Sequence, residues 1–247
     1  FSLMNAAMPV LFPGNTQEIL ELGLLGIALS RYTGAWCGLR LLTQVCDGGG
    51  RVEVSLDGRR VVLPEGYEKK TDARLLIPYT SMIEPEANRR RLEAAKAFAR
   101  ANGLNRWFGA KENARLGIAT AGKYYYDLMQ ALRDLGIGKD DLAAMGIRIA
   151  KFGMTFPVEP VFAREFATGL EKIFVIEEKR SFLEMQLRDA LYNSAVHPLI
   201  VGKEDEQGAA LLPAAGELDP DVIARAVAGR LMEGRESVRA RLNRLEA

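Results

Sequence analysis

The hydrophobic and polar positions of this chain alternate regularly from Arg115 onward. Short apolar runs, rich in β-branched and aromatic side chains, are separated by polar stretches with an apolar residue at every third or fourth position. Such runs are typical of strands buried on both faces, and such stripes are typical of amphipathic helices. The pattern predicts strands at residues 116–120, 147–151, 173–176 and 199–202.

Helices are predicted between and after these strands. Strands joined by single helices, roughly thirty residues apart, imply right-handed βαβ crossovers. We therefore predict an α/β fold with a Rossmann-like, mostly parallel sheet and helices on both faces. The helices are residues 160–168 and the stripes Tyr125/Leu128/Leu132/Leu135, Leu183/Leu187/Leu191 and Ile223/Val227/Leu231.

The first third of the chain predicts part of a second α/β domain. Residues 10–12 read as a strand, and Asn15 with Glu18 offers a capping pair for a helix that ends near Gly34. The stripe Leu20, Leu24 and Ile27 is expected to face the core. Residues 35–45 read as a second buried strand. Two alternating stretches around Asp57-Gly58, at residues 52–56 and 61–63, predict a β-hairpin.

The polar stretch LPEGYEKKTD at residues 63–72 is predicted to be a linker, and Pro85 is predicted to open a connector helix. The cluster Arg89, Arg90 and Arg91 on this helix reads as a solvated face, not as a phosphate site. The chain is accordingly divided into residues 1–72, 73–110 and 111–247.

Composition excludes several function classes. The 33 basic and 32 acidic residues leave a net charge of +1, which gives no general attraction to nucleic acid or to anionic membranes. The apolar stretch LLGIAL is far shorter than the roughly 20 residues of a membrane span. Cys37, Cys46 and the single histidine, His197, lack metal-ligand spacing, so we expect no metal site and a reduced, cytoplasmic setting. Because the chain starts at Phe1, we expect it to be a piece of a longer protein.

The segment from Gly117 to Lys123 has the glycine and lysine spacing of a phosphate-binding loop, but it does not predict a nucleotide site. Tyr124 stands where the loop needs Ser or Thr, and Gly117 falls inside the predicted strand. Gly122 is expected to provide a close turn from strand to helix. We assign no catalytic residue, since no nucleophile-elbow, zinc-helix or dinucleotide motif occurs.

Two adjacent carboxylates, Glu177 and Glu178, end the predicted strand at residues 173–176. Ser181 and Glu184 have capping-box spacing, so the turn is expected to occupy its own helix amides and to exclude anions. The two glutamates could form a general acid/base pair. We favour a role as exposed interface residues that meet a neighbouring domain or subunit.

Three segments carry a family resemblance: LGIATAGKYYYDLMQALRDLGI, KFGMTFPVEP and KIFVIEEKRSFLEMQLRDAL. Together they resemble the transketolase C-terminal-like domain of thiamine-diphosphate-dependent 2-oxoacid oxidoreductases, in the indolepyruvate:ferredoxin oxidoreductase branch. Gly153 and Pro157 fill its Gly-x-x-x-Pro positions, and Glu177 with Glu178 fills its Val-x-Glu-Glu ending. Residues 8–45 resemble the end of the preceding pyrimidine-binding domain, through Gln17-Glu18, Leu39-Arg40 and Thr43.

The resemblance implies an intact enzyme that oxidatively decarboxylates aryl 2-oxoacids to acyl-CoA and passes electrons to ferredoxin. Thiamine diphosphate, magnesium and iron-sulfur clusters are its implied cofactors. This sequence contains no Gly-Asp-Gly segment and no cluster of cysteine ligands, so we expect no cofactor in the fragment. The fragment is expected to be structural and inactive alone, with Arg40 and Thr43 as substrate-cleft candidates.

The implied partners are the remaining domains or subunits, ferredoxin and coenzyme A, in a homo-oligomer without nucleic acid or membrane. Two alternatives remain at this point: a non-catalytic scaffolding module, and a transketolase or 2-oxoacid dehydrogenase β-type subunit.

Overall fold

The computed structural model describes residues 1–247 apart from 56–59, 72, 73, 75, 232–235, 246 and 247. The chain divides into two compact units. The first contains residues 1–105 and 152–162, and the second contains residues 106–151 and 163–247. The predicted connector at residues 73–110 therefore lies almost entirely in the first unit.

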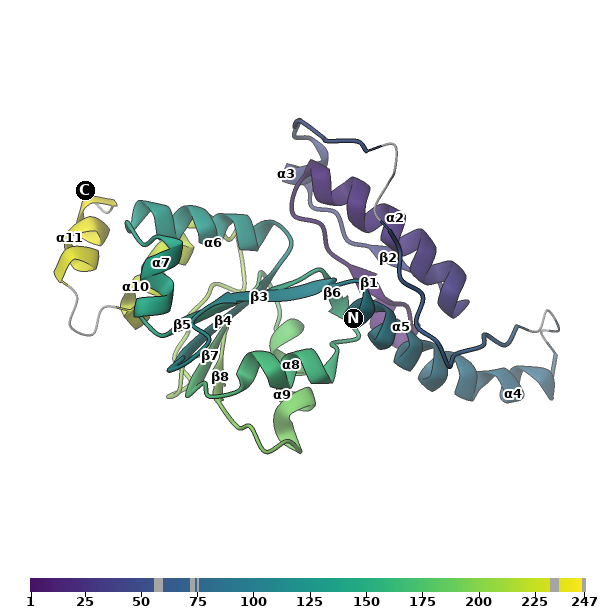
Figure 1. Ribbon diagram of the computed structural model, residues 1–247. Coiled ribbons are helices and arrows are strands. Elements are labelled where there is room, and N and C mark those ends of the chain that lie inside the picture. The colour runs from purple at the N-terminus through teal and green to yellow at the C-terminus, as the bar shows by residue number, and fades with distance from the viewer. Residues whose placement is uncertain (56–59, 72–73, 75, 232–235, 246–247) are drawn as a thin grey trace. The chain divides into compact units, whose positions relative to one another are not determined.

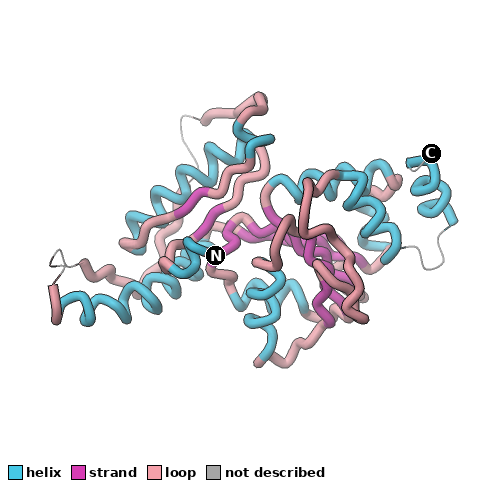
Figure 2. The backbone as a smooth tube through the Cα atoms, turned by 180° about the vertical axis from the view of Figure 1, so that it is seen from behind, coloured by secondary structure: helices cyan, strands magenta, loops and turns pink. Residues whose placement is uncertain are grey.

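The first unit contains a three-stranded sheet with the order β2-β1-β6. Its strands are labelled in Figure 1, and Figure 2 draws all strands in magenta. Its strands are short: β1 is Val10–Leu11, β2 is Gly38–Leu39 and β6 is Met154–Phe156. Strand β1 pairs parallel with β2 and antiparallel with β6. Helix α2, Thr16–Thr33, joins β1 to β2 and completes a βαβ unit.

The ends of α2 are where the sequence predicted them. The Asn15 side chain accepts a hydrogen bond of 2.9 Å from the Glu18 N–H, and Glu18 accepts one of 2.9 Å from the Gly14 N–H. The first bond satisfies an amide that the helix start leaves open, and the second ties the residue before the N-cap to the first turn. At the other end, Gly34 takes the left-handed conformation, with φ 73°.

The predicted core stripe of α2 was wrong. Leu22, Leu25 and Leu29 are the buried leucines, and they share a core cluster with Phe98 and two alanines, Ala95 and Ala99, of α5, Arg91–Ala101. Leu24 and Ile27, which were expected in the core, are 54% and 51% exposed. The misassignment arises because α2 is apolar on two sides and periodicity alone does not select between them.

The remainder of the first unit is mainly helical. Helices α1, Ser2–Asn5, and α3, Thr43–Cys46, are single turns. Helix α4, Tyr79–Pro85, continues through a π-helical segment, η1, Glu86–Arg90, into α5. The predicted strand at residues 35–45 was therefore wrong outside Gly38–Leu39, because α3 already begins at Thr43.

The predicted hairpin turn at Asp57-Gly58 lies outside the described residues. The described residues beside it, 51–55 and 60–63, form no strand. The backbone of these two segments forms hydrogen bonds with side-chain amides instead. Gln17 exchanges two hydrogen bonds with Glu53, of 2.8 and 3.3 Å, and Asn102 exchanges two with Val62, of 2.9 and 2.7 Å. These amides offer the donor and acceptor that a neighbouring strand would offer.

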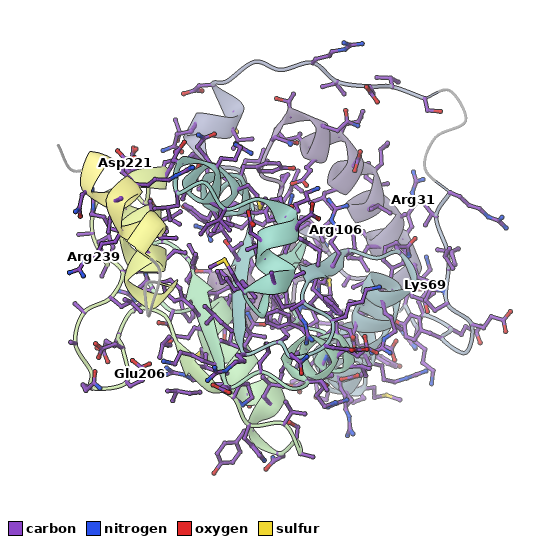
Figure 3. The ribbon with its side chains drawn as sticks, turned by 60° about the vertical axis from the view of Figure 1, so that its left-hand side comes forward. Arg31, Lys69, Arg106, Glu206, Asp221 and Arg239 are labelled. Carbon is purple, nitrogen blue, oxygen red and sulfur yellow. The ribbon has the colours of Figure 1, made fainter. Side chains whose placement is uncertain are left out.

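The predicted linker packs on the first unit. The Tyr67 hydroxyl donates to the Thr33 carbonyl at 2.8 Å and bonds Glu86 at 2.9 Å. Lys69 donates to the Arg31 carbonyl at 2.8 Å; both residues are labelled in Figure 3. Arg90 pairs with Glu86 at 3.0 Å, so the arginine cluster is partly engaged within the protein.

The second unit is built on a five-stranded sheet with the order β3-β5-β4-β7-β8 (Figure 1). Strands β4, β7 and β8 are parallel neighbours, which confirms the predicted α/β fold with βαβ crossovers. Helices α6 and α10 lie on one side of the sheet, and α8 and α9 lie on the other. The strands are β3 Asn105–Gly109, β4 Leu116–Ala121, β5 Ile147–Phe152, β7 Lys172–Ile176 and β8 Leu199–Val201. The helices are α6 Lys123–Asp134, α7 Lys139–Ala144, α8 Pro160–Ala167, α9 Leu183–Tyr192, α10 Pro220–Leu231 and α11 Glu236–Leu245.

A buried arginine locks the end of α8 to the second unit. The Arg148 guanidinium donates to the Phe166 carbonyl at 2.6 Å and the Thr168 carbonyl at 3.0 Å. It also donates to the Ala110 carbonyl at 2.9 Å. Burial lowers the pKa of Arg148. The guanidinium therefore satisfies carbonyls that a helix C-terminus leaves open.

Candidate functional site

The carboxyl ends of β4 and β7 form the candidate site. Thr120 and Ile176 are paired at these ends, and the Thr120 hydroxyl donates to the Ile176 carbonyl at 3.0 Å. Each strand leads directly into a helix, β4 into α6 and β7 into α9. In open α/β sheets this end of the strands is where ligand crevices form.

Glu177 caps helix α9. Its carboxylate accepts hydrogen bonds from the N–H groups of Phe182 at 2.9 Å, Leu183 at 2.8 Å and Glu184 at 3.1 Å. Burial raises the pKa of Glu177, against the effect of these three backbone donors. The expectation that Ser181 caps this helix was therefore wrong, because the strand-end carboxylate already occupies the first turn of amides.

Ser181 and Glu184 interact through their side chains. The Ser181 hydroxyl donates to the Glu184 carboxylate at 2.8 Å. Glu184 is 3% exposed, pairs with Arg188 at 2.6 Å and accepts the Lys203 N–H at 3.3 Å. A Cβ at Gly202 would collide with this carboxylate. Glu184 thus joins α9 to the segment that follows β8.

Glu178 and Lys203 tie further loops to the same turn. Glu178 accepts a hydrogen bond of 3.3 Å from the Leu218 N–H. Lys203 donates to the Glu177 carbonyl at 2.5 Å and to the Pro213 carbonyl at 3.0 Å, and burial lowers its pKa. The expectation that both glutamates are exposed was wrong, since both are partly buried. Their assignment to an interface stays a prediction.

The junction between β4 and α6 is different. Gly122 has φ 55°, and α6 starts at Lys123 without a side-chain cap. Lys123 pairs with Asp127 at 2.6 Å on its own helix. Burial raises the pKa of Asp127, and Lys123 opposes that change. Gly117 lies inside β4, as predicted, and therefore not in a loop that could surround a phosphate.

Lys151 was missed by sequence reasoning. It ends the predicted strand at residues 147–151 and is 4% exposed in β5. Its ammonium lies 3.1 Å from the Tyr126 hydroxyl and 4.5 Å from the centre of the Tyr125 ring. A charged residue at the end of a predicted buried strand was the available signal, because burying a charge requires a partner.

Arg40 and Thr43, the substrate-cleft candidates, lie in the first unit. The Arg40 guanidinium stands 4.4 Å from the centre of the Phe12 ring, and the Arg40 N–H donates to the Leu11 carbonyl at 2.8 Å. Thr43 is exposed and begins α3. Their role in a substrate cleft stays a prediction.

Metal-ligating side chains do not gather in the part of the chain that the structure describes. No group of three or more His, Cys, Asp or Glu residues there is arranged to hold a metal ion. None of the described helices is both long enough and apolar enough to cross a membrane. The titratable groups at the ends of β4 and β7 mainly form hydrogen bonds and ion pairs with the backbone and with neighbouring side chains.

Comparisons with known proteins agree with the architecture. Residues 106–247 match the profile of the indolepyruvate oxidoreductase domain. The indolepyruvate oxidoreductase subunit IorA of Methanothermobacter thermautotrophicus is 27% identical over 226 residues, which are 91% of this chain and 34% of the relative. The subunit IorA of Thermococcus kodakarensis is 29% identical over 210 residues, which are 81% of this chain and 30% of the relative. The chain therefore spans about a third of the length of these curated relatives.

A solved structure shares the fold. The 2-oxoglutarate:ferredoxin oxidoreductase from Magnetococcus marinus aligns with a TM-score of 0.52 and 13% identity, over 91% of this chain and 42% of that chain. The family profile covers more than half of the 247 residues. The chain therefore belongs to the indolepyruvate oxidoreductase domain family.

Proposed function

We propose that this chain is part of an indolepyruvate ferredoxin oxidoreductase. The intact enzyme oxidatively decarboxylates aryl 2-oxoacids to acyl-CoA and passes the electrons to ferredoxin. The family match over residues 106–247 carries this proposal, supported by the similarity to IorA subunits along most of the chain. Ferredoxin and coenzyme A are the proposed partners, in the cytoplasm.

Within that enzyme, the chain has a structural and interface role. Glu177 and Glu184 are bonded to backbone and side chains of their own unit. Magnesium, thiamine diphosphate and the iron-sulfur clusters are proposed to be held by other parts of the parent polypeptide, because this sequence contains no Gly-Asp-Gly segment and no cluster of cysteine ligands. The units are proposed as the end of a pyrimidine-binding domain and a transketolase C-terminal-like domain, in an oligomeric enzyme.

The test compares the parent enzyme with the 247-residue chain under anaerobic conditions. The parent, purified with its partner subunit, should reduce ferredoxin when given indolepyruvate and coenzyme A. The chain alone should show neither turnover nor calorimetric binding of thiamine diphosphate with magnesium. Ketol transfer by the parent without ferredoxin reduction would support a transketolase instead. Micromolar cofactor binding by the chain alone would refute the structural role.

A further inference from the structure

The first unit has a cavity beside the π-helical segment η1. Its volume is about 620 Å³, within the range of roughly 300–1,000 Å³ that is typical of small-molecule sites. Two stretches of chain line it: residues 69–71 of the predicted linker, and part of α4 and η1 between Met82 and Arg90 (Figure 1). Single π-helical turns within α-helices occur frequently at functional sites.

Positive charge predominates in the lining of this cavity. Lys69, Lys70 and Arg90 contribute three cations, whereas Glu86 is the one acidic group among the described residues that line it. Glu86 is 5% exposed, and its two oxygens accept hydrogen bonds from the Tyr67 hydroxyl at 2.9 Å and from Arg90 at 3.0 Å. Burial and the bond to Glu86 raise the pKa of Tyr67 to about 12, so this hydroxyl stays a proton donor. Because Glu86 offsets Arg90, the two lysines leave the lining with a net positive charge.

The backbone beside the cavity is held by an arginine and a lysine. The Lys69 ammonium donates to the Arg31 carbonyl at 2.8 Å, and the Arg91 guanidinium donates to the Lys70 carbonyl at 3.0 Å. Among the described residues, no side chain pairs with the Lys70 ammonium, and the buried Arg91 Nε has no hydrogen-bond acceptor. A buried donor without an acceptor in the protein calls for an anion or a water molecule.

The cavity also has an apolar side, formed by Met82, Ile83 and Pro85. Lysine and arginine bind phosphate groups well, and apolar side chains contact the organic part of a ligand. The two lysines favour an anion with more than one negative charge, since a single carboxylate would offset only one of them. The lining therefore fits a multivalent anion attached to an organic body.

We propose that the cavity beside η1 binds the diphosphate group of an organic ligand, without a metal ion. Magnesium needs oxygen ligands, and both oxygens of Glu86 are already hydrogen-bonded. The magnesium complex of thiamine diphosphate is therefore excluded from this site. ADP and coenzyme A both carry a diphosphate on an organic body and represent two sources of this chemistry. The cavity lies in the first unit, whereas the match over residues 106–247 carries the proposed function, so either proposal can fail without the other.

The main experiment titrates the 247-residue chain calorimetrically with pyrophosphate, ADP and coenzyme A, in the absence of magnesium. Pyrophosphate should bind, and at least one organic diphosphate should bind more tightly, because its body contacts the apolar side. The tighter of the two identifies the source. Added magnesium should weaken binding, since it offsets the charge of the phosphates. Absence of binding, tighter binding with magnesium, or no gain for either organic ligand over pyrophosphate would overturn the proposal.

Loss of one lysine locates the anion. Lys70→Gln should weaken the binding of the preferred ligand by about tenfold or more, the effect of losing one charge-assisted hydrogen bond. Lys111→Gln removes the same charge from an exposed position of the second unit and should leave the affinity unchanged. Equal weakening by the two variants would mean a general attraction between charges, and the proposal would be wrong.

A carboxylate on the apolar side gives a second test. Met82→Glu should weaken binding by about tenfold or more, because the new charge repels the phosphates. Met185→Glu, on an exposed position of α9, is the matched control and should not change the affinity. Met82 is 72% exposed, so both variants should fold, which circular dichroism checks. Unchanged binding by folded Met82→Glu would place the ligand elsewhere and refute this site.

Discussion

The crossovers β1-α2-β2 and β7-α9-β8 are both parallel strand–helix–strand units, but they are buried to different depths. In the second unit, four consecutive β7 residues are fully buried and α9 buries Leu183, Leu187 and Leu191. In the first unit, β1 and β2 each have two residues, and α2 leaves Leu24 and Ile27 about half exposed. The local sequence pattern produces a strand–helix–strand crossover in both cases. The elements that pack against each crossover decide how many of its apolar side chains are buried.

The two helices also start differently. The cap of α2 comes from the adjacent Asn15, within one turn of the chain. The cap of α9 comes from Glu177, five to seven residues before the amides that it binds. A cap from the preceding strand couples the helix start to the sheet, whereas a local cap does not.

The largest effect should come from the covered crossover. Phe174→Ala removes a fully buried ring from the centre of β7 and should lower the free energy of unfolding of the 247-residue chain by about 3–5 kcal/mol. Leu24→Ala on α2 should cost less than about 0.5 kcal/mol. Denaturant titration followed by circular dichroism measures both. Equal losses would mean that the two crossovers are equally covered.

An intermediate effect should follow loss of the α9 cap. Glu177→Gln leaves one oxygen for three amide donors and should cost about 1–2 kcal/mol. Ser181→Ala should cost less, since Ser181 bonds only a side chain that has other partners. A larger loss of unfolding free energy for Ser181→Ala than for Glu177→Gln would show that Ser181 is the cap of α9.

The stability difference between wild type and Glu177→Gln should also depend on pH. Burial raises the pKa of Glu177 above its ordinary 4.5, so the folded state binds this proton more tightly than the unfolded state. The stability from that proton is fully present below 4.5 and is lost as pH rises through the folded pKa. The stability of wild type relative to Glu177→Gln should therefore grow as pH falls from neutral toward 4.5. A pH-independent difference would contradict this cause.

The smallest effect should be a gain. Gly23→Ala should stabilise the 247-residue chain by about 0.5–1 kcal/mol, because the new methyl group meets nothing and helix propensity improves. Gly117→Ala is the contrast, since its methyl group would lie 2.8 Å from Phe166 and must destabilise. Thermal denaturation distinguishes the signs. Loss of stability in Gly23→Ala would show that the exposed face of α2 is already packed.

Much of the candidate site could be placed from the sequence, but not its bonding. The position of Glu177 at a strand end followed from a short apolar run, and the structure has it there. Its bonds to α9 depend on how the intervening turn folds back, which residue spacing does not specify. Lys151 escaped notice because its tyrosine neighbours come from another element, α6.

The sequence by itself determined the elements whose signals are local. Strands β4, β5, β7 and β8 of the second unit follow from compact apolar runs, whereas β3 was not predicted; the ends of α2 follow from Asn15 and Gly34. Tertiary structure alone decided which apolar face of α2 is buried, because that depends on where Phe98 of α5 packs. It also decided that the amides of Gln17 and Asn102 bond the segments predicted as a hairpin. The reason is that burial and long-range hydrogen bonds depend on residues distant in sequence, whereas periodicity and capping depend on residues within one or two turns.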